Sequence, residues 1–207
     1  MSGNGKGLIV SVSGPSGVGK GTVIKCVREM RPGFAHSVSV TTRAPREGEE
    51  EGVAYFFRTH EEFDRLFESG EIIERDEFVG NYYGTPSAPL IKMSGEGTDV
   101  LLDLTVAGSL ALKEKFDETV TIFLLPPSFD ELESRLRSRG TEAEETIRRR
   151  LSKAREEVTA APGFDYVVVN RDVEEAARQI LAITDAEKLR YSRNNGIEKD
   201  LFDAAGK

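Results

Sequence analysis

The sequence predicts an α/β fold, in which a mostly parallel β-sheet is flanked by helices and interrupted by one inserted lobe. Short apolar runs rich in β-branched residues alternate with segments whose apolar residues recur at helical spacing. A glycine-rich loop follows the first run, and the stretch 35–90 breaks the alternation with Gly, Pro, Tyr and charged residues. We therefore expect a core formed by 1–34 and 91–191, a lobe at 35–90 and a C-terminal tail at 192–207.

Composition and charge favour one domain with a local anion site. The 207 residues, 38% of them hydrophobic, are enough to bury one core. A net charge of −8 excludes a general attraction to nucleic acid or to an anionic membrane. The single cysteine, Cys26, excludes an intramolecular disulfide and a multi-cysteine metal site. The apolar runs are far shorter than the roughly 20 residues of a membrane span, and no signal-peptide pattern follows Lys6, so we expect a cytoplasmic protein.

The individual elements follow from the apolar pattern and from capping residues. The patterns Thr59-x-x-Glu62 and Ser128-x-x-Glu131 are capping boxes, and each precedes apolar residues at helical spacing. Further amphipathic helices are expected at 147–158 and at 173–181. The runs expected to form strands are 7–13, 37–40, 99–104, 120–125 and 166–169.

The loop at residues 14–20 matches the pattern G-x-x-x-x-G-K, directly after an apolar run and directly before a helical segment. In that context backbone N–H groups form a nest for phosphate oxygens, and Lys20 can reach the β- and γ-phosphates of ATP. The alternative, a glycine-rich turn with a solvated lysine, does not explain the flanking strand and helix. The predicted ATP-binding residues of this segment are Gly14, Pro15, Ser16, Gly17, Val18, Gly19, Lys20, Gly21 and Thr22.

The loop lacks the hydroxyl residue that usually binds Mg²⁺ in this motif. Gly21 stands where a Ser or Thr would bind Mg²⁺, and Thr22 is rotated by about 100° around the helix. We therefore expect no direct protein ligand: the ion would be held by ATP phosphates and water. Asp103, at the end of an apolar run, is a candidate acceptor for those waters, although it could instead cap the end of its strand.

A second phosphate site is suggested by the loop after residue 40. Arg43, Arg46 and Tyr55 offer two planar guanidiniums and a phenol, although paired arginines in a polar loop also suit a solvated face. Here the sequence resembles the guanylate kinase family, bacterial type, over about residues 8–170. The segments GNYYGTP (80–86), LPPS (125–128) and RGTE (139–142) share the likeness. The family signature T-[ST]-R-x2-[KR]-x2-[DE]-x2-G-x2-Y-x-[FY] is matched by Thr41, Thr42, Arg43, Arg46, Glu49, Gly52, Tyr55 and Phe57.

The resemblance implies a P-loop nucleoside monophosphate kinase fold with a GMP-binding lobe and a helical lid at about 136–151. It implies transfer of a phosphoryl group from ATP·Mg²⁺ to GMP or dGMP. An ionised Glu74 can accept from both N1–H and the N2 amine of guanine, whereas adenine presents an unprotonated N1. Tyr83 could instead be a core aromatic, and Glu74 a surface carboxylate. The implied GMP-binding residues are Ser39, Arg43, Arg46, Tyr55, Glu74, Tyr83, Thr85 and Asp103.

One segment departs from the family. Relatives commonly carry D-x-D/E-x-Q-G where this chain has Asp103-Leu104-Thr105-Val106-Ala107-Gly108. Because Thr105 cannot carry charge, one contact to the guanine amine is neutral or missing. We expect weaker GMP binding or less strict base choice.

The segment 131–155 is locally basic, with eight basic side chains against five acidic ones. Glu residues four positions earlier account for Arg135, Arg137, Arg148 and Arg149 as helix-surface ion pairs. Arg139 and Arg150 follow no such Glu and are predicted to stabilise the transferring phosphoryl group. The resemblance adds Arg135 as a phosphate ligand and Asn170 near adenine, although a strand-end Asn is more often a turn former. The predicted catalytic residues are Lys20, Arg43, Arg139 and Arg150.

Three other functions fit the sequence less well. A scaffold module of this fold that binds phosphopeptides would not need the intact Lys20 loop. A kinase for a ribose bisphosphate would not need a purine site built from Glu74, Ser39 and Thr85. Plain GTP hydrolysis would leave the second phosphate clamp without a purpose. The expected partners are ATP and GMP, with no nucleic acid or membrane, in a monomer or homodimer.

Overall fold

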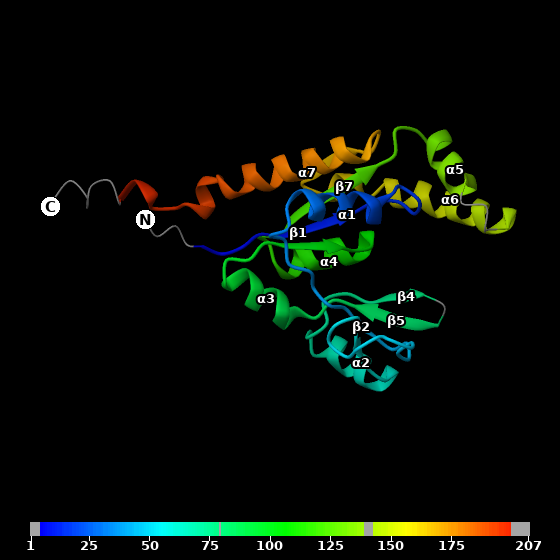
Figure 1. Ribbon diagram of the computed structural model, residues 1–207, viewed down its shortest axis with the longest axis horizontal. Coiled ribbons are helices and arrows are strands. Elements are labelled where there is room, and N and C mark those ends of the chain that lie inside the picture. Colours follow the sequence, from blue (N-terminus) through cyan, green and yellow to red (C-terminus); the bar gives the residue numbers. More distant parts are fainter. Residues whose placement is uncertain (1–4, 79, 139–142, 200–207) are drawn as a thin grey trace.

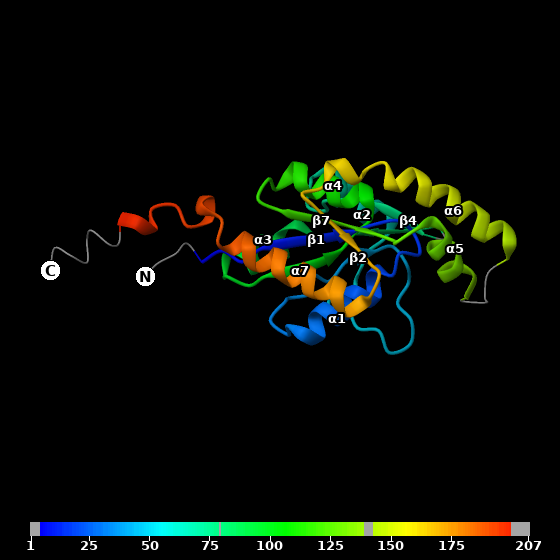
Figure 2. The same cartoon turned by 90° about the horizontal axis from the view of Figure 1, so that it is seen from above.

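The structure, a computed structural model, describes residues 5–78, 80–138 and 143–199, and its core is a four-stranded parallel sheet (Figures 1 and 2). The strand order is β6-β1-β7-β8, so the first strand lies inside the sheet between two later ones. The strands are β1 (Ile9–Ser13), β6 (Val100–Asp103), β7 (Val120–Leu125) and β8 (Tyr166–Val169). The predicted mostly parallel sheet is confirmed.

Helices cover both faces of this sheet, which explains why its strands are mostly apolar, with Ser11, Ser13 and Thr121 buried among the apolar residues. On one face α1 (Lys20–Met30) and α7 (Val173–Lys188) pack against each other, and α4 (Val106–Lys115) lies on the other face (Figures 1 and 2). The core between them is fully buried at Val10, Val23 and Ile180 on one side, and at Leu112 on the other.

A second sheet, built from strands between residues 40 and 84, forms a separate layer within the segment 35–90, which is here called the lobe. Its strand order is β3-β2-β5-β4, with β2 parallel to β3 and antiparallel to β5. The run predicted as a strand at 37–40 contributes only Val40, because the chain leaves the edge of the parallel sheet after an isolated bridge at Ala35. The strands are β2 (Val40–Thr41), β3 (Phe56–Phe57), β4 (Asp76–Phe78) and β5 (Asn81–Gly84).

The capping box predicted for the lobe helix, α2 (His60–Glu68), is confirmed. Glu62 N donates to Thr59 Oγ1 at 3.1 Å, and Thr59 N donates to Glu62 Oε2 at 2.8 Å. This box fixes the start of α2 and places Phe63 in the lobe core. At the second predicted box only half forms: Glu131 N donates to Ser128 Oγ at 3.1 Å.

The helices α5 (Phe129–Ser138) and α6 (Glu144–Val158) project beyond the carboxyl end of the parallel sheet, at the same end of the molecule as β4 and β5 (Figures 1 and 2). They pack through Leu132, Leu136, Ile147 and Ala154. The ion pairs predicted along α6 are redirected. Glu144 binds Arg137 of α5 at 2.5 and 2.8 Å, since the first turn of α6 faces α5, and Glu145 lies 3.9 Å from Arg148.

A helix that the sequence did not indicate, α3 (Ser87–Gly95), connects the lobe to the parallel sheet and packs on β6. Pro86 precedes it without a side-chain cap, so the usual start signal is missing. Two short 3₁₀ turns, Ala161–Gly163 and Tyr191–Arg193, complete the elements. In the part of the chain that the structure describes, no helix combines the length and the apolar character that crossing a membrane requires.

Candidate active site

The glycine-rich loop, here called the P-loop (residues 14–20), connects the end of β1 to the start of α1. Gly19 is the N-cap of α1 with φ 94°, and a Cβ there would lie 2.9 Å from Asn170 Nδ2. Gly17 has φ 90°, and a Cβ there would lie 2.6 Å from Leu136 Cδ2. Both positions therefore require glycine. The backbone amides that surround the start of α1 form the kind of nest that binds phosphate.

Lys20 links this loop to the end of β6. Its ammonium lies 2.9 Å from Asp103 Oδ1 and donates to the carbonyl oxygen of Leu104 at 2.5 Å. Because β6 neighbours β1 in the sheet, both strands deliver these groups to the same carboxyl edge. Lys20 and Asp103, which were predicted from separate motifs, are thus brought together.

Arg135 and Asn170, which the resemblance assigns to ATP, both contact the P-loop backbone. Asn170 Nδ2 donates to the carbonyl oxygen of Val18 at 2.8 Å, and Arg135 Nη1 donates to the same oxygen at 3.2 Å. Arg135 Nη2 also donates to the carbonyl of Asn170, and its Nε to Glu131. In this conformation Arg135 therefore supports the loop. Asn170 is buried, and its Oδ1 has no partner among the described residues.

One face of α6 lies against the N-terminal half of the P-loop, at Ser16. Arg150 Nε donates to Ser16 Oγ at 3.0 Å, and Ser16 N donates to Glu157 Oε2 at 2.9 Å. Lys153 Nζ lies 3.8 Å from Glu157 Oε1. These side chains and the P-loop line a cavity of about 490 Å³. Lys153 and Glu157 were missed from the sequence, although their spacing from Arg150 places all three on one helix face. The predicted Arg139 lies outside the described residues.

In the lobe, three of the four predicted GMP-phosphate residues come together. Arg43 Nη2 donates to both oxygens of Glu49 at 2.8 and 2.9 Å, and its guanidinium lies 5.5 Å from the centre of the Tyr55 ring. The rings of Tyr55 and Tyr83 meet edge to face with centroids 5.9 Å apart. The Arg43 guanidinium lowers the pKa of Glu49, so this carboxylate stays ionised. Arg46 joins the group through its backbone, because its N–H donates to Glu49 Oε2 at 2.8 Å.

Glu74 is the buried carboxyl group of the lobe, with only 8% of its surface exposed. Thr85, itself buried, donates its hydroxyl to Glu74 Oε1 at 2.7 Å. The pKa of Glu74 is raised from 4.5 to about 7, mainly by burial. The hydrogen bond from the Thr85 hydroxyl opposes this rise, and the nearby Asp76 adds to it. Ser39, the remaining residue predicted for guanine, is half-buried immediately before β2.

The start of α4 packs against this carboxyl group. Thr105 is the N-cap of α4, and its hydroxyl accepts from Gly108 N at 3.1 Å. A Cβ at Gly108 would lie 3.0 Å from Glu74 Cγ and 3.2 Å from Thr105 Oγ1. The residue that departs from the family pattern therefore lies beside Glu74 and has a structural role of its own. Through this contact the lobe meets the parallel sheet close to Lys20 and Asp103.

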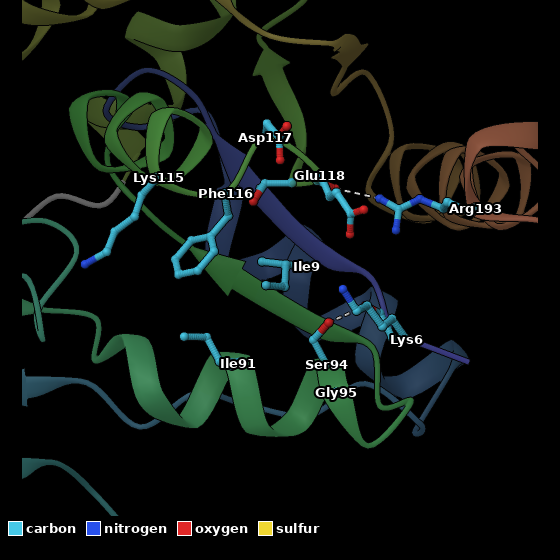
Figure 3. Close-up of a pocket in the computed structure, with 12 residues that line it drawn as sticks. Lys6, Ile9, Ile91, Ser94, Gly95, Lys115, Phe116, Asp117, Glu118 and Arg193 are labelled. Carbon is cyan, nitrogen blue, oxygen red and sulfur yellow. Dashed lines mark hydrogen bonds between the residues drawn. The ribbon is translucent and has the colours of Figure 1, made fainter. Parts of the chain in front are cut away.

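A second cavity, of about 510 Å³, lies at the opposite end of the parallel sheet (Figure 3). It is lined by Ile9 at the start of β1 and by Phe116 in the connection that leads into β7, with Ile91 of α3 beside them. Arg193 donates to the carbonyl of Glu118 at 2.6 Å at its edge. None of the predicted site residues in the described part of the chain lines it. The length of the strands separates it from the P-loop.

Comparisons with known proteins agree with this geometry. The family model described as guanylate kinase matches residues 6–187. The guanylate kinase of Halalkalibacterium halodurans is 47% identical over 188 residues, covering 91% of this chain and 92% of that protein. The guanylate kinase of Caldanaerobacter subterraneus is 46% identical over 197 residues, covering 95% and 94%. The crystal structure of guanylate kinase from Anaplasma phagocytophilum is 37% identical, has a TM-score of 0.72 and covers 94% of this chain and 93% of that one.

Proposed function

Because the chain belongs to the guanylate kinase family, we propose that the residues around the P-loop and in the lobe carry out its reaction. The chain is an ATP-dependent guanylate kinase, which phosphorylates GMP to GDP. The observation that carries the site assignment is the meeting of two sites: Lys20 of the P-loop is bonded to Asp103, and Glu74 of the lobe lies against the start of α4.

On the ATP side, the P-loop amides and Lys20 bind the β- and γ-phosphates, and Arg150 approaches from α6. The bond between the γ-phosphorus and ADP breaks as a bond to a GMP phosphate oxygen forms, with no covalent enzyme intermediate. Positive charge from Lys20 and Arg150 offsets the negative charge on the transferring group. Asn170 is assigned to the adenine side of the site by the family resemblance; its Oδ1 is buried and has no partner among the described residues. Arg135 holds the P-loop through the carbonyl oxygen of Val18.

On the GMP side, Arg43, Arg46, Tyr55 and Tyr83 bind the phosphate and orient its attacking oxygen. Glu49 supports this arrangement because both of its carboxylate oxygens accept from Arg43 Nη2, which holds that end of the guanidinium in place. Glu74 accepts from the guanine edge, and Thr85 and Ser39 complete the base site.

Mg²⁺ fits the space beside Asp103. A Cβ at Gly21 would lie 4.0 Å from Asp103 Oδ2. Gly21 and Asp103 line a cavity of about 390 Å³, which leaves space for a hydrated ion. Mg²⁺ keeps several waters and prefers oxygen ligands. The described residues hold no cluster of three His, Cys, Asp or Glu side chains that could bind the ion alone. We therefore assign the ion to ATP phosphates and water, with Asp103 accepting from the waters; when bound, it neutralises phosphate charge.

Three further assignments complete the proposal. The GMP-binding lobe extends over 35–90, and the core is formed by 1–34 and 91–191. The lid, at about 136–151, is part of that core. The protein acts as a monomer or homodimer, which light scattering at several concentrations would distinguish. It acts in the cytoplasm, where its nucleotide substrates are found; cell fractionation tests this.

The function is tested by measuring ADP formation with ATP·Mg²⁺ and each of GMP, dGMP, AMP, CMP and UMP. We expect turnover only with the guanine nucleotides. Folded protein that turns over none of them would contradict the assignment and favour a phosphopeptide scaffold. A kinase for another acceptor would instead turn over a ribose bisphosphate supplied in a parallel assay.

The Thr105→Asp variant is expected to lower KM for GMP by about three- to tenfold. The new carboxylate adds an ionised acceptor for the guanine amine, but repulsion from Glu74 offsets part of the gain. Asp also keeps the cap on Gly108 N, so α4 is preserved. Steady-state kinetics with GMP and AMP measure the effect. Thr105→Asn is the control, since it keeps the cap without charge. An unchanged KM in the Asp variant would remove Thr105 from the base site.

A further inference from the structure

Glu157 is an acidic side chain in a site built for anions. Its Oε2 accepts from the backbone N–H of Ser16 at 2.9 Å, within the P-loop. The carboxylate comes from the C-terminal half of α6, 141 residues away in sequence. Its side chain is 19% exposed, so the contact is largely shielded from solvent. A carboxylate and a phosphate offer the same kind of oxygen acceptor to an N–H group.

The surroundings of Glu157 are those of a phosphate rather than of a structural carboxylate. Arg150 donates to the hydroxyl of the same residue, Ser16, at 3.0 Å, and Lys153 lies 3.8 Å from the second oxygen of Glu157. A backbone amide, an arginine and a lysine therefore converge on Glu157 and Ser16. The same groups line the cavity beside the P-loop.

The position of Ser16 in the loop indicates which phosphate it faces. The α- and β-phosphates lie at the end of the loop that opens α1, beyond Gly19. Ser16 lies in the N-terminal half of the loop, away from α1, and this half faces α6 and its basic side chains. If the α- and β-phosphates bind at the start of α1, the terminal phosphate of a triphosphate would reach Ser16, whereas a diphosphate, one phosphate shorter, would not.

We propose that Glu157 occupies the place of the terminal phosphate of ATP, and that ATP must displace this carboxylate whereas ADP need not. The inference rests on the proposed function, because it assumes that the P-loop binds the ATP phosphates. Glu157 is thus a competing anion within the site, which weakens ATP binding and leaves ADP binding unchanged. When the phosphoryl group has moved to GMP, the carboxylate can return to Ser16.

The displacement also links ATP binding to α6. Arg150, Lys153 and Glu157 lie on one helix, so a phosphate that arrives at Ser16 repels one side chain and attracts two. We expect ATP, but not ADP, to change the contacts between α6 and the P-loop.

The test is the binding of ATP and ADP, each with Mg²⁺ and without GMP, to the full chain and to Glu157→Gln, measured by calorimetry. Glutamine keeps the size and the acceptor oxygen but loses the charge. We expect Kd for ATP to fall by about three- to tenfold and Kd for ADP to stay within twofold. Glu156→Gln is the matched control, because Glu156 neighbours Glu157 on α6 and is exposed; both constants should stay unchanged.

Two outcomes overturn the proposal. Weaker or unchanged ATP binding in Glu157→Gln would show that the carboxylate does not compete with the terminal phosphate. Equal tightening of ATP and ADP would show a general charge effect. Glu157→Ala, which also removes the acceptor, should tighten ATP binding too, and thermal melts verify that both variants fold. If the proposed function itself were wrong, the unmodified chain would not phosphorylate GMP, which is a separate result.

Discussion

Replacing Lys20 with alanine is expected to lower kcat for GMP phosphorylation by about 10²–10³-fold, which is the usual effect of removing one group that stabilises transition-state charge. Lys20 is the single P-loop side chain with a fixed positive charge, and the contacts to Asp103 and to the carbonyl of Leu104 hold it at the carboxyl edge of the sheet. Alanine leaves the loop amides in place, so ATP should still bind, more weakly, while the transfer step slows.

The effect is measured by steady-state kinetics at saturating ATP and GMP, with ATP binding followed separately. Lys25→Ala is the matched control: Lys25 lies on the same helix, its side chain is 78% exposed, and its ion pair with Glu29 spans 3.8 Å. We expect the control to retain full activity. A Lys20→Ala variant that keeps more than a tenth of the original kcat would contradict the assigned role.

Replacing Glu74 with glutamine is expected to reduce kcat/KM for GMP by about 10- to 100-fold. Guanine presents two donors at the edge that Glu74 faces, and an ionised carboxylate can accept both, whereas an amide accepts one and opposes the other with its own N–H group. AMP has an unprotonated N1 there, so the preference for GMP over AMP should narrow in the variant.

The raised pKa of Glu74 adds a signature in pH. Because the carboxyl group titrates near pH 7, only about a tenth of it is ionised at pH 6, and the apparent Kd for GMP should be about tenfold weaker at pH 6 than at pH 8. Glu74→Gln should lose this part of the pH dependence and keep only the part due to the GMP phosphate. Glu77→Gln, at an exposed site on β4, is the control. A pH profile unchanged by Glu74→Gln would refute the assignment.

Most of the fold could be predicted from short stretches of sequence, namely apolar runs and capping residues. The apolar runs at 120–125 and 166–169 form β7 and β8 with the expected bounds. β7 is apolar because both of its faces are covered, whereas β8, at the edge of the sheet, leaves Val167 and Val169 exposed. The box of Thr59 and Glu62 marked α2 because capping is decided within four residues. The lobe was harder to predict: β2 and β3 have two residues each, too few for alternation to register, and α3 starts after Pro86 without a cap.

The residues of the site can likewise be divided into those predictable from local sequence and those brought together only by the fold. Lys20 belongs to a continuous motif, so sequence order alone could place it, whereas Glu74 lies in no such motif and was assigned only through the family resemblance. Their contacts to Asp103 and Gly108, by contrast, depend on the pairing of distant elements. Glu157 had no motif of its own, and only the packing of α6 on the P-loop brings it to Ser16.

The burial of Glu74 also affects how long the empty protein survives. Its pKa is raised from 4.5 to about 7, so between these pH values the folded chain holds more protons than the unfolded chain, and the free energy of unfolding falls as pH rises through them. The loss is on the order of 2–4 kcal/mol above pH 7. Bound GMP, which donates to the carboxylate, restores stability by mass action. In a cell, a larger supply of GMP is therefore expected to slow the loss of this chain to proteases.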